Sequence, residues 1–204
     1  MIRFFLAASL LGLTALPAAA ESLTKTYSYF SVGGTTLDEL ENQLNKRGPQ
    51  VKSTGRRHPG ATRMQFNTRL GYTERSGSCR VTEATVTVKA KVILPRWRQR
   101  GKAEQDGRII WDTLSGDIKR HEEQHVTIAQ DHARELERKL LRIGRQKNCA
   151  IAAEKAKATA DRVLDRHDKA QAKFDSDEGA NFEKRLLKLL RQRMKMIEAG
   201  EIAG

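Results

Sequence analysis

Two histidines and a glutamate in the middle of the chain have the residue types and the spacing of a metal site. His121, Glu122 and His125 form the pattern His-Glu-x-x-His. Residues four apart lie one above the other on a helix, so both imidazoles are able to bind one metal ion, which is usually Zn²⁺ for this pattern. Glu122 lies one step around the helix, where it can act as general base on a metal-activated water without being a ligand.

The residues around this motif predict a long helix that presents both histidines on its inner face. Apolar residues and histidines recur at steps of three and four over residues 111–143, and His121 and His125 belong to that stripe. A pair of core histidines without a metal is the alternative, but the glutamate in register between them favours the metal site. We expect a break near residues 115–117, where Asp117 would cap a new helix carrying the motif.

A catalytic zinc site usually has three protein ligands and one open position, so the motif needs a third ligand. His132 lies on the same stripe, but a continuous helix places it about 16 Å from His121. The short connection before residue 149 predicts that a second helix returns antiparallel to the first, which brings Asp175 within a turn of the metal. Asp175 is therefore our first choice, and His167, roughly 9 Å away along the helix axis, is the second. Further options are Asp177 and Glu178.

The first half of the chain predicts a small antiparallel sheet with one short helix. Alternating and β-branched residues indicate strands over residues 25–32, 63–70 and 79–94. A capping box of Thr36 and Glu39 begins the short helix. With the motif-bearing hairpin and a basic amphipathic helix over residues 181–197, the sequence predicts an α+β fold.

The N-terminus and the cysteines indicate an exported protein, either periplasmic or secreted. Residues 1–20 have a basic start, a short apolar run and an Ala-x-Ala ending, which is the pattern of a signal peptide. That run is too short to span a bilayer comfortably, so no transmembrane helix is expected in the mature chain. The chain has two cysteines, Cys79 and Cys149, which predict a disulfide in an exported protein, with two buried thiols as the alternative.

The chain is strongly basic, with a formal net charge of +13, or +12 without Arg3 of the signal peptide. Such a charge predicts attraction to anionic surfaces or acidic substrates. An anionic cell envelope is the expected surface, and no nucleic acid is expected because an exported chain rarely meets it. The final basic helix would either pack on the domain or lie on an anionic membrane.

Several of these segments together resemble a bacterial family of predicted secreted zinc-dependent proteases, first described as a domain of unknown function. The resemblance covers about Lys25 to Gly179. It implies peptidase activity and a bound zinc ion. It rests on the signal peptide, Gly33-Gly34-Thr35-Thr36, Gly48-Pro49, Cys79, Leu94-Pro95-x-Trp97, Trp111, His121-Glu122-x-x-His125, Cys149 and Phe174-Asp175.

The sequence thus predicts a signal peptide over residues 1–20, a zincin-like metallopeptidase domain over 21–179 and a basic C-terminal helix over 180–204. The leading hypothesis for function is an exported zinc-dependent peptidase that hydrolyses peptides or proteins, with Glu122 as general base. The alternative is a non-catalytic cationic envelope-binding protein whose metal site is structural. A third hypothesis is a metallohydrolase that acts on a non-peptide amide.

Overall fold

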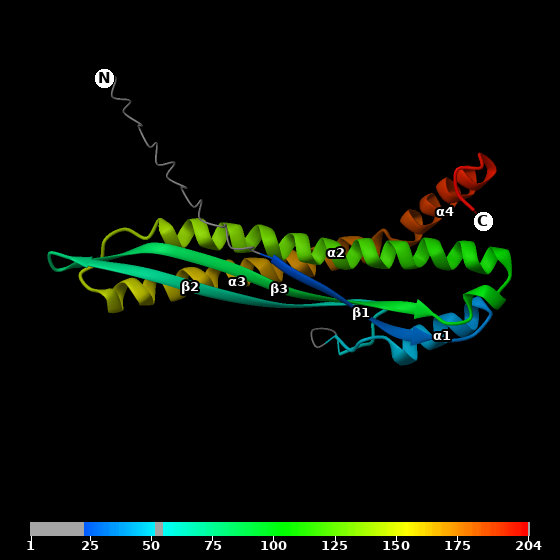
Figure 1. The fold of residues 1–204 in the computed structure, drawn as a ribbon, viewed down its shortest axis with the longest axis horizontal. Coiled ribbons are helices and arrows are strands. Elements are labelled where there is room, and N and C mark those ends of the chain that lie inside the picture. Colours follow the sequence, from blue (N-terminus) through cyan, green and yellow to red (C-terminus); the bar gives the residue numbers. More distant parts are fainter. Residues whose placement is uncertain (1–22, 52–54, 204) are drawn as a thin grey trace, which may run out of the picture.

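Helix α2 (Gln105–Leu141) is the longest element and lies along the length of the molecule (Figure 1). A computed structural model describes residues 23–51 and 55–203, so the predicted signal peptide over residues 1–20 lies outside the described residues. The α+β class is confirmed. The other elements are β1 (Leu23–Val32), α1 (Leu37–Arg47), β2 (Ala61–Arg75), β3 (Ser78–Trp97), a short 3₁₀ helix (Arg100–Lys102), α3 (Cys149–Ala180) and α4 (Phe182–Glu198).

The sheet has the strand order β1-β3-β2, with the longest strand in the centre. β2 and β3 form an antiparallel hairpin around Ser76 and Gly77, which both have positive φ, as a tight hairpin turn requires. β1 pairs parallel to β3, so the prediction of a purely antiparallel sheet was wrong. The chain reverses once through α1 and again at the hairpin, and these two reversals leave β3 running in the direction of β1.

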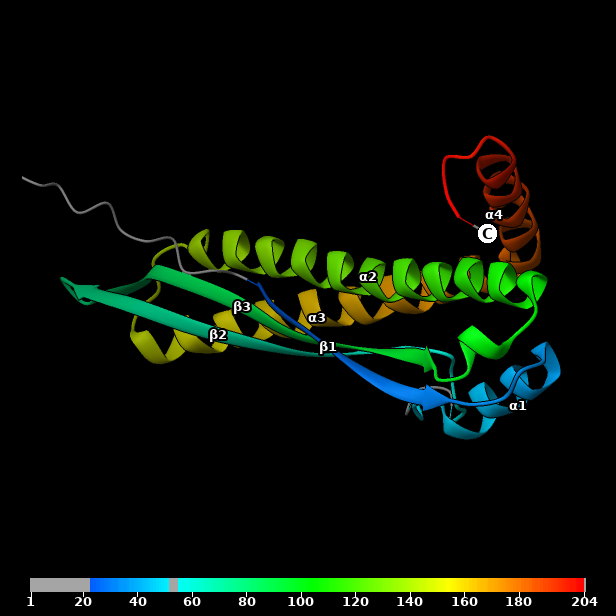
Figure 2. The same cartoon turned by 45° about the vertical axis from the view of Figure 1, so that its right-hand side comes forward.

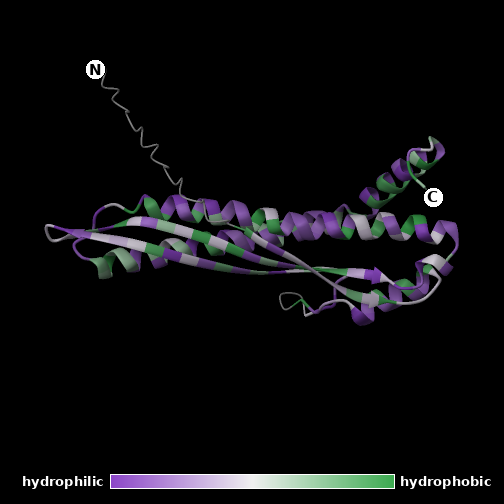
Figure 3. Ribbon diagram, viewed as in Figure 1, coloured by the Kyte–Doolittle hydropathy of each residue, from purple (hydrophilic) through white to green (hydrophobic). Residues whose placement is uncertain are grey.

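One face of the sheet packs against the helices. Side chains alternate along β3, so one parity forms an apolar face that the colours of Figure 3 show as bands. The register of β2 against β3 shifts between Gly71 and Tyr72, which marks a β-bulge in this strand pair. The buried residues on the helix-facing parity of β3 are Val86, Val88, Ala90, Val92 and Leu94.

Helices α2 and α3 form the predicted hairpin, and α2 is one continuous helix. The expected break near residues 115–117 is therefore wrong. Asp117 is buried inside the helix and forms ion pairs with Arg120 and Arg185, so it does not cap a new helix. Apolar contacts of α2 with the sheet hold Gly116 in helical conformation despite its low intrinsic propensity.

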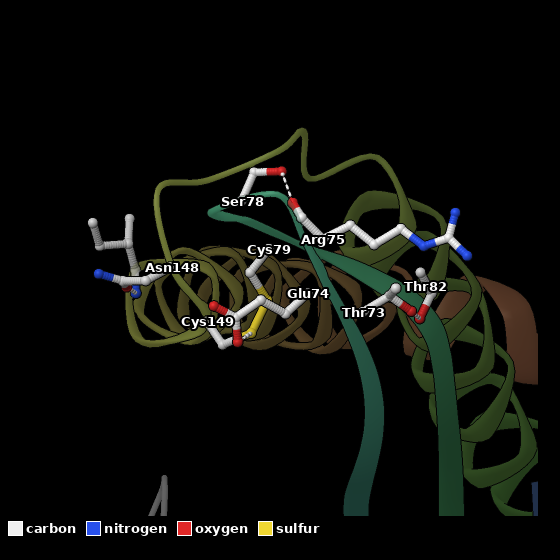
Figure 4. The surroundings of a disulfide bond; sticks show 9 residues. Thr73, Glu74, Arg75, Ser78, Cys79, Thr82, Asn148 and Cys149 are labelled. Carbon is white, nitrogen blue, oxygen red and sulfur yellow. Dashed lines mark hydrogen bonds between the residues drawn. A yellow bond between two sulfur atoms is a disulfide. The ribbon is translucent and has the colours of Figure 1, made fainter.

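The predicted disulfide joins Cys79 at the start of β3 to Cys149 at the start of α3 (Figure 4). Two backbone hydrogen bonds between Cys79 and Gln146, of 2.8 and 2.7 Å, hold the same two segments together. Asn148 caps α3 by accepting a hydrogen bond from the backbone N–H of Ile151. The tip of the helical hairpin is therefore fastened to the sheet.

Helix α4 projects away from the end of the hairpin (Figure 2), and none of its residues is buried. Arg185 and Arg193 attach it to α2 through ion pairs with Asp117 and Asp112. Over the described residues, no helix combines the length and the apolar character that crossing a membrane requires.

Candidate metal site

The hairpin brings His121 and His125 of α2 together with Asp175 of α3. The Nε2 atoms of the two histidines lie 3.1 Å apart. Asp175 Oδ1 lies 3.3 Å from Nε2 of His121 and 3.0 Å from Nε2 of His125. The structure therefore places the first-choice third ligand beside the motif.

These three atoms form a nearly equilateral triangle with the dimensions of a metal site. Bonds of about 2.0–2.1 Å in a tetrahedral zinc site separate neighbouring ligand atoms by roughly 3.3–3.4 Å. The observed separations of 3.0–3.3 Å fall within a few tenths of an ångström of that value. Two imidazole nitrogens and a carboxylate oxygen, all within 4.8 Å of one another, are able to hold a divalent metal ion.

A hydrogen bond fixes the orientation of His125. Its Nδ1–H donates to Oε1 of Gln171 at 2.5 Å, which leaves the Nε2 lone pair directed at the site. The amide group of Gln171 donates in turn to the backbone carbonyl of His125 at 3.0 Å and to Nε2 of His167 at 2.9 Å. Gln171 is therefore held from two sides while it holds the imidazole.

The second-choice ligand, His167, supports this network and lies away from the metal position. Its Nδ1–H donates to Asp168 at 2.9 Å, so its Nε2 accepts from Gln171. Burial lowers the pKa of His167 and outweighs the opposing effect of Asp168, which favours the neutral imidazole that this pattern needs. The spacing of His167, Gln171 and Asp175, each four residues from the next, is the sequence signal that identifies Gln171.

Replacing Gln171 with leucine should weaken metal binding by about 10–100-fold. Without the hydrogen bond to Gln171, neither the tautomer nor the ring orientation of His125 is fixed. Competition with a chromophoric chelator measures this affinity. Gln124→Leu makes the same change at an exposed position of α2 and should leave the affinity unaltered. Equal affinities of the two variants would contradict the role of Gln171.

The further options Asp177 and Glu178 do not join the triangle. Asp177 pairs with Lys173 at 2.5 Å on the exposed face of α3. Glu178 lies 3.6 Å from Nδ1 of His121, on the side of the ring away from the other ligand atoms, and accepts a hydrogen bond from Arg120. Phe174 also supports the histidines, since its ring stacks on His121 with centroids 4.9 Å apart.

Asp175 remains ionised beside the two imidazoles. Partial burial raises its pKa, but hydrogen bonds and charges from His121 and His125 outweigh that effect and hold the pKa well below its usual range. In His125, burial lowers the pKa, and the hydrogen bonds to Asp175 and Gln171 raise it by more. A metal ion that binds Nε2 of His125 would therefore compete with protonation of this imidazole.

Glu122 lies next to the ligand group and is only 5% exposed. Thr62 of β2 donates a hydrogen bond of 2.8 Å to its Oε2 atom. Burial raises the pKa of Glu122. The hydrogen bond from Thr62 and the charges of the two histidines lower this pKa by a smaller amount, so the net shift is upward. Gly60 makes room for this carboxylate, because a Cβ atom there would lie 2.7 Å from Oε1 of Glu122 and 2.8 Å from Ile118. Neither Thr62 nor Gly60 was predicted from the sequence.

A pocket of about 270 Å³ opens onto His121, Glu122 and Asp175. Its walls are largely apolar and come from the segment before β2, from α2 and from the α3–α4 junction. His58 is half-buried in one wall. The remaining lining residues are Pro59, Gly60, Asp117, Ile118, Glu178, Gly179, Phe182 and Arg185.

The fold and the site define an α+β protein with a histidine–histidine–aspartate group that is able to bind a metal ion. The chain belongs to a family of bacterial proteins of unknown function, DUF922, which it matches over residues 27–183. The matched part begins within β1, extends through α3 and contains every residue of the candidate site. No curated protein and no solved structure matches the chain.

Proposed function

We propose that the protein is an exported zinc-dependent peptidase in which His121, His125 and Asp175 hold the metal and Glu122 is the general base. One observation carries the proposal. Three ligand atoms converge within 4.8 Å at a pocket, with a buried carboxylate of raised pKa directly beside them. This combination is typical of metal-assisted hydrolysis.

The side chains of the site have separate roles in the proposed reaction. Zinc would supply a Lewis acid that polarises a carbonyl oxygen and lowers the pKa of water. Glu122 takes the proton that the attacking water loses and delivers it to the leaving nitrogen. Thr62 holds Oε2 of that carboxylate, while Oε1 lies toward Gly60 at the pocket. Gln171 and Phe174 keep the two imidazoles in place.

The number of ligands supports a catalytic rather than a structural site. A structural zinc site is closed by four protein ligands, whereas catalytic sites have three and keep one position open. Among the described residues, the group consists of His121, His125 and Asp175, and all three atoms lie within reach of one ion. A structural metal site would require a fourth protein ligand within reach of the same ion.

Export is supported by the disulfide between Cys79 and Cys149, because such bonds persist in oxidising compartments. We propose accordingly that residues 1–20 direct the chain out of the cytoplasm and are removed. The protein for every experiment below is therefore the chain without residues 1–20, produced in an oxidising compartment.

Metal analysis and a cleavage assay test this proposal together. We expect about one zinc ion per chain and cleavage of a labelled unfolded protein such as casein. A chelator should stop this cleavage, and added zinc should restore it. His125→Ala should lower the zinc affinity by more than about 100-fold, because even the loss of a residue that hydrogen-bonds to a ligand lowers metal affinity by about 10–100-fold. His132→Gln, on the same helix but away from the group, is the control and should retain the zinc.

Two results would count against the proposal in different ways. A protein that takes up no zinc after reconstitution would remove the metal site itself. A protein with one zinc ion per chain and no hydrolysis of unfolded proteins or short peptides would retain the site and remove the peptidase activity.

A further inference from the structure

The face of the sheet opposite the long helices carries a cluster of positively charged residues that is separate from the metal site. Arg63, Arg69, Lys89 and Lys91 are all exposed there. The register places Arg63 directly opposite Lys91 and Gln65 opposite Lys89. Side chains of alternating residues share a face, so these four cations project from the same side of β2 and β3.

Among the described residues, these cations have no ion-pair partners, in contrast to three of the lysines on α3. On α3, Lys157, Lys169 and Lys173 each pair with an aspartate four residues away, at 2.5–2.8 Å. Within residues 23–51 and 55–203, by contrast, none of the four sheet cations forms an ion pair. This part of the outer sheet face thus carries four exposed positive charges that no described acidic side chain pairs with.

The arrangement costs folding stability unless something neutralises it. Like charges directly opposite each other on neighbouring strands are destabilising, and Arg63 and Lys91 form such a pair. Along a strand, residues two apart are separated by about 6.8 Å, so Lys89 and Lys91 repeat at that spacing. A linear chain of regularly spaced negative charges lying along the strands would meet each cation in turn.

The neighbouring side chains on this face are hydrogen-bonding groups. β1 adds Thr24 and Thr26, which lie beside Lys89 and Lys91 in the parallel register. Hydroxyl and amide groups both donate and accept, as the hydroxyls of sugars do. A shallow hollow of about 320 Å³ runs between these residues and Arg63. The polar side chains of the face are Thr24, Thr26, Ser28, Gln65, Asn67, Thr85 and Thr87.

The composition of the face argues against other anionic partners. Nucleic acid binding usually uses aromatic side chains on which bases stack, and this parity of the three strands contains none over residues 24–28, 61–69 and 85–93. Binding within a bilayer interface needs a buried apolar surface. The apolar side chains of the same stretch are only Ala61 and Ile93.

We infer that the outer face of the sheet, defined by Arg63, Arg69, Lys89, Lys91 and the hydroxyl and amide side chains around them, binds a linear acidic polysaccharide. The carboxylates of the polymer pair with the four cations, and its hydroxyls bond to the threonines and amides. The binding face belongs to the same domain as the metal site but needs no metal, so it does not depend on the proposed peptidase activity.

Affinity electrophoresis through gels containing polygalacturonate, at near-physiological salt, tests this inference. The triple variant Arg63→Gln, Lys89→Gln, Lys91→Gln should bind at least about 10-fold more weakly than the unaltered protein, since the cooperating charges are lost. The matched control is Lys188→Gln, Arg191→Gln, Lys195→Gln on α4, which removes the same charge from three exposed residues. This control should bind within about 2-fold of the unaltered protein.

Two further arms distinguish the polymer from other anions. Polyphosphate in the gel and vesicles of anionic phospholipid present the same sign of charge without carboxylated sugars. We expect both to bind more weakly than polygalacturonate. Equal losses in the two triple variants, equal or stronger binding of polyphosphate or vesicles, or no binding of polygalacturonate would each overturn the inference. Zinc content and the melting temperature of each variant report folding separately.

Discussion

Replacing Glu122 with glutamine should leave zinc binding intact and lower the rate of peptide hydrolysis by about 10²–10⁴-fold, the usual contribution of a general base. Glutamine keeps the size of the side chain and its hydrogen bond with Thr62 but does not accept a proton at neutral pH. The measurements are kcat on a labelled peptide and zinc content by elemental analysis.

The neighbouring glutamate supplies the matched control for this prediction. Glu123 makes contacts with Tyr27 and Lys25 on the flank of β1, away from the ligand triangle. Glu123→Gln should therefore change kcat by no more than a few-fold. If Glu122→Gln retained full activity with zinc bound, the assignment of the base would be wrong.

Removing the disulfide with Cys79→Ser and Cys149→Ser should lower the free energy of unfolding by about 4 kcal/mol. The two cysteines are 70 residues apart, and closing a loop of that length restricts the unfolded chain by roughly this amount in the chain-entropy model. Denaturant unfolding, with the slope compared between the two proteins, measures the change.

The location of the disulfide separates its effect on stability from any effect on the metal site. The bond fastens the tip of the α2–α3 hairpin (Figure 4), whereas His125 lies near the middle of α2 and Asp175 near the C-terminal end of α3. Under conditions where both proteins are folded, the double serine variant should retain about one zinc ion per chain. A change below 1 kcal/mol would contradict the entropic account of this bond.

The parts of the site that lie on the two long helices could be predicted because helices repeat regularly. The period of α2 placed His121 and His125 on one face, and the short connection at residues 146–148 fixed which level of α3 they meet. That reasoning selected Asp175. Gln171 was missed because a glutamine at helical spacing is usually a surface residue, so its four-residue spacing from His167 and Asp175 gains meaning only with its contacts.

The remaining differences arise from contacts between segments distant in the sequence. The alternation in β1 is the same for a parallel and an antiparallel neighbour, so the sequence did not reveal its direction. Asp117 looked like a helix cap, but Arg185, 68 residues later, pairs with it and keeps it inside α2. Thr62 and Gly60 act on Glu122 across a similar gap in the sequence.

Helix α4 has a consequence for the dynamics of the pocket. It contributes Phe182 and Arg185 to the pocket wall, yet it has no buried residue and is attached to α2 partly through ion pairs. Segments with few buried contacts open locally at a much lower free energy than the whole domain. The amide hydrogens of α4 should therefore exchange with solvent far faster than those of α2, and faster still as salt screens the ion pairs. One wall of the cleft can then detach and rebind while the ligand triangle, held between two long helices, stays intact.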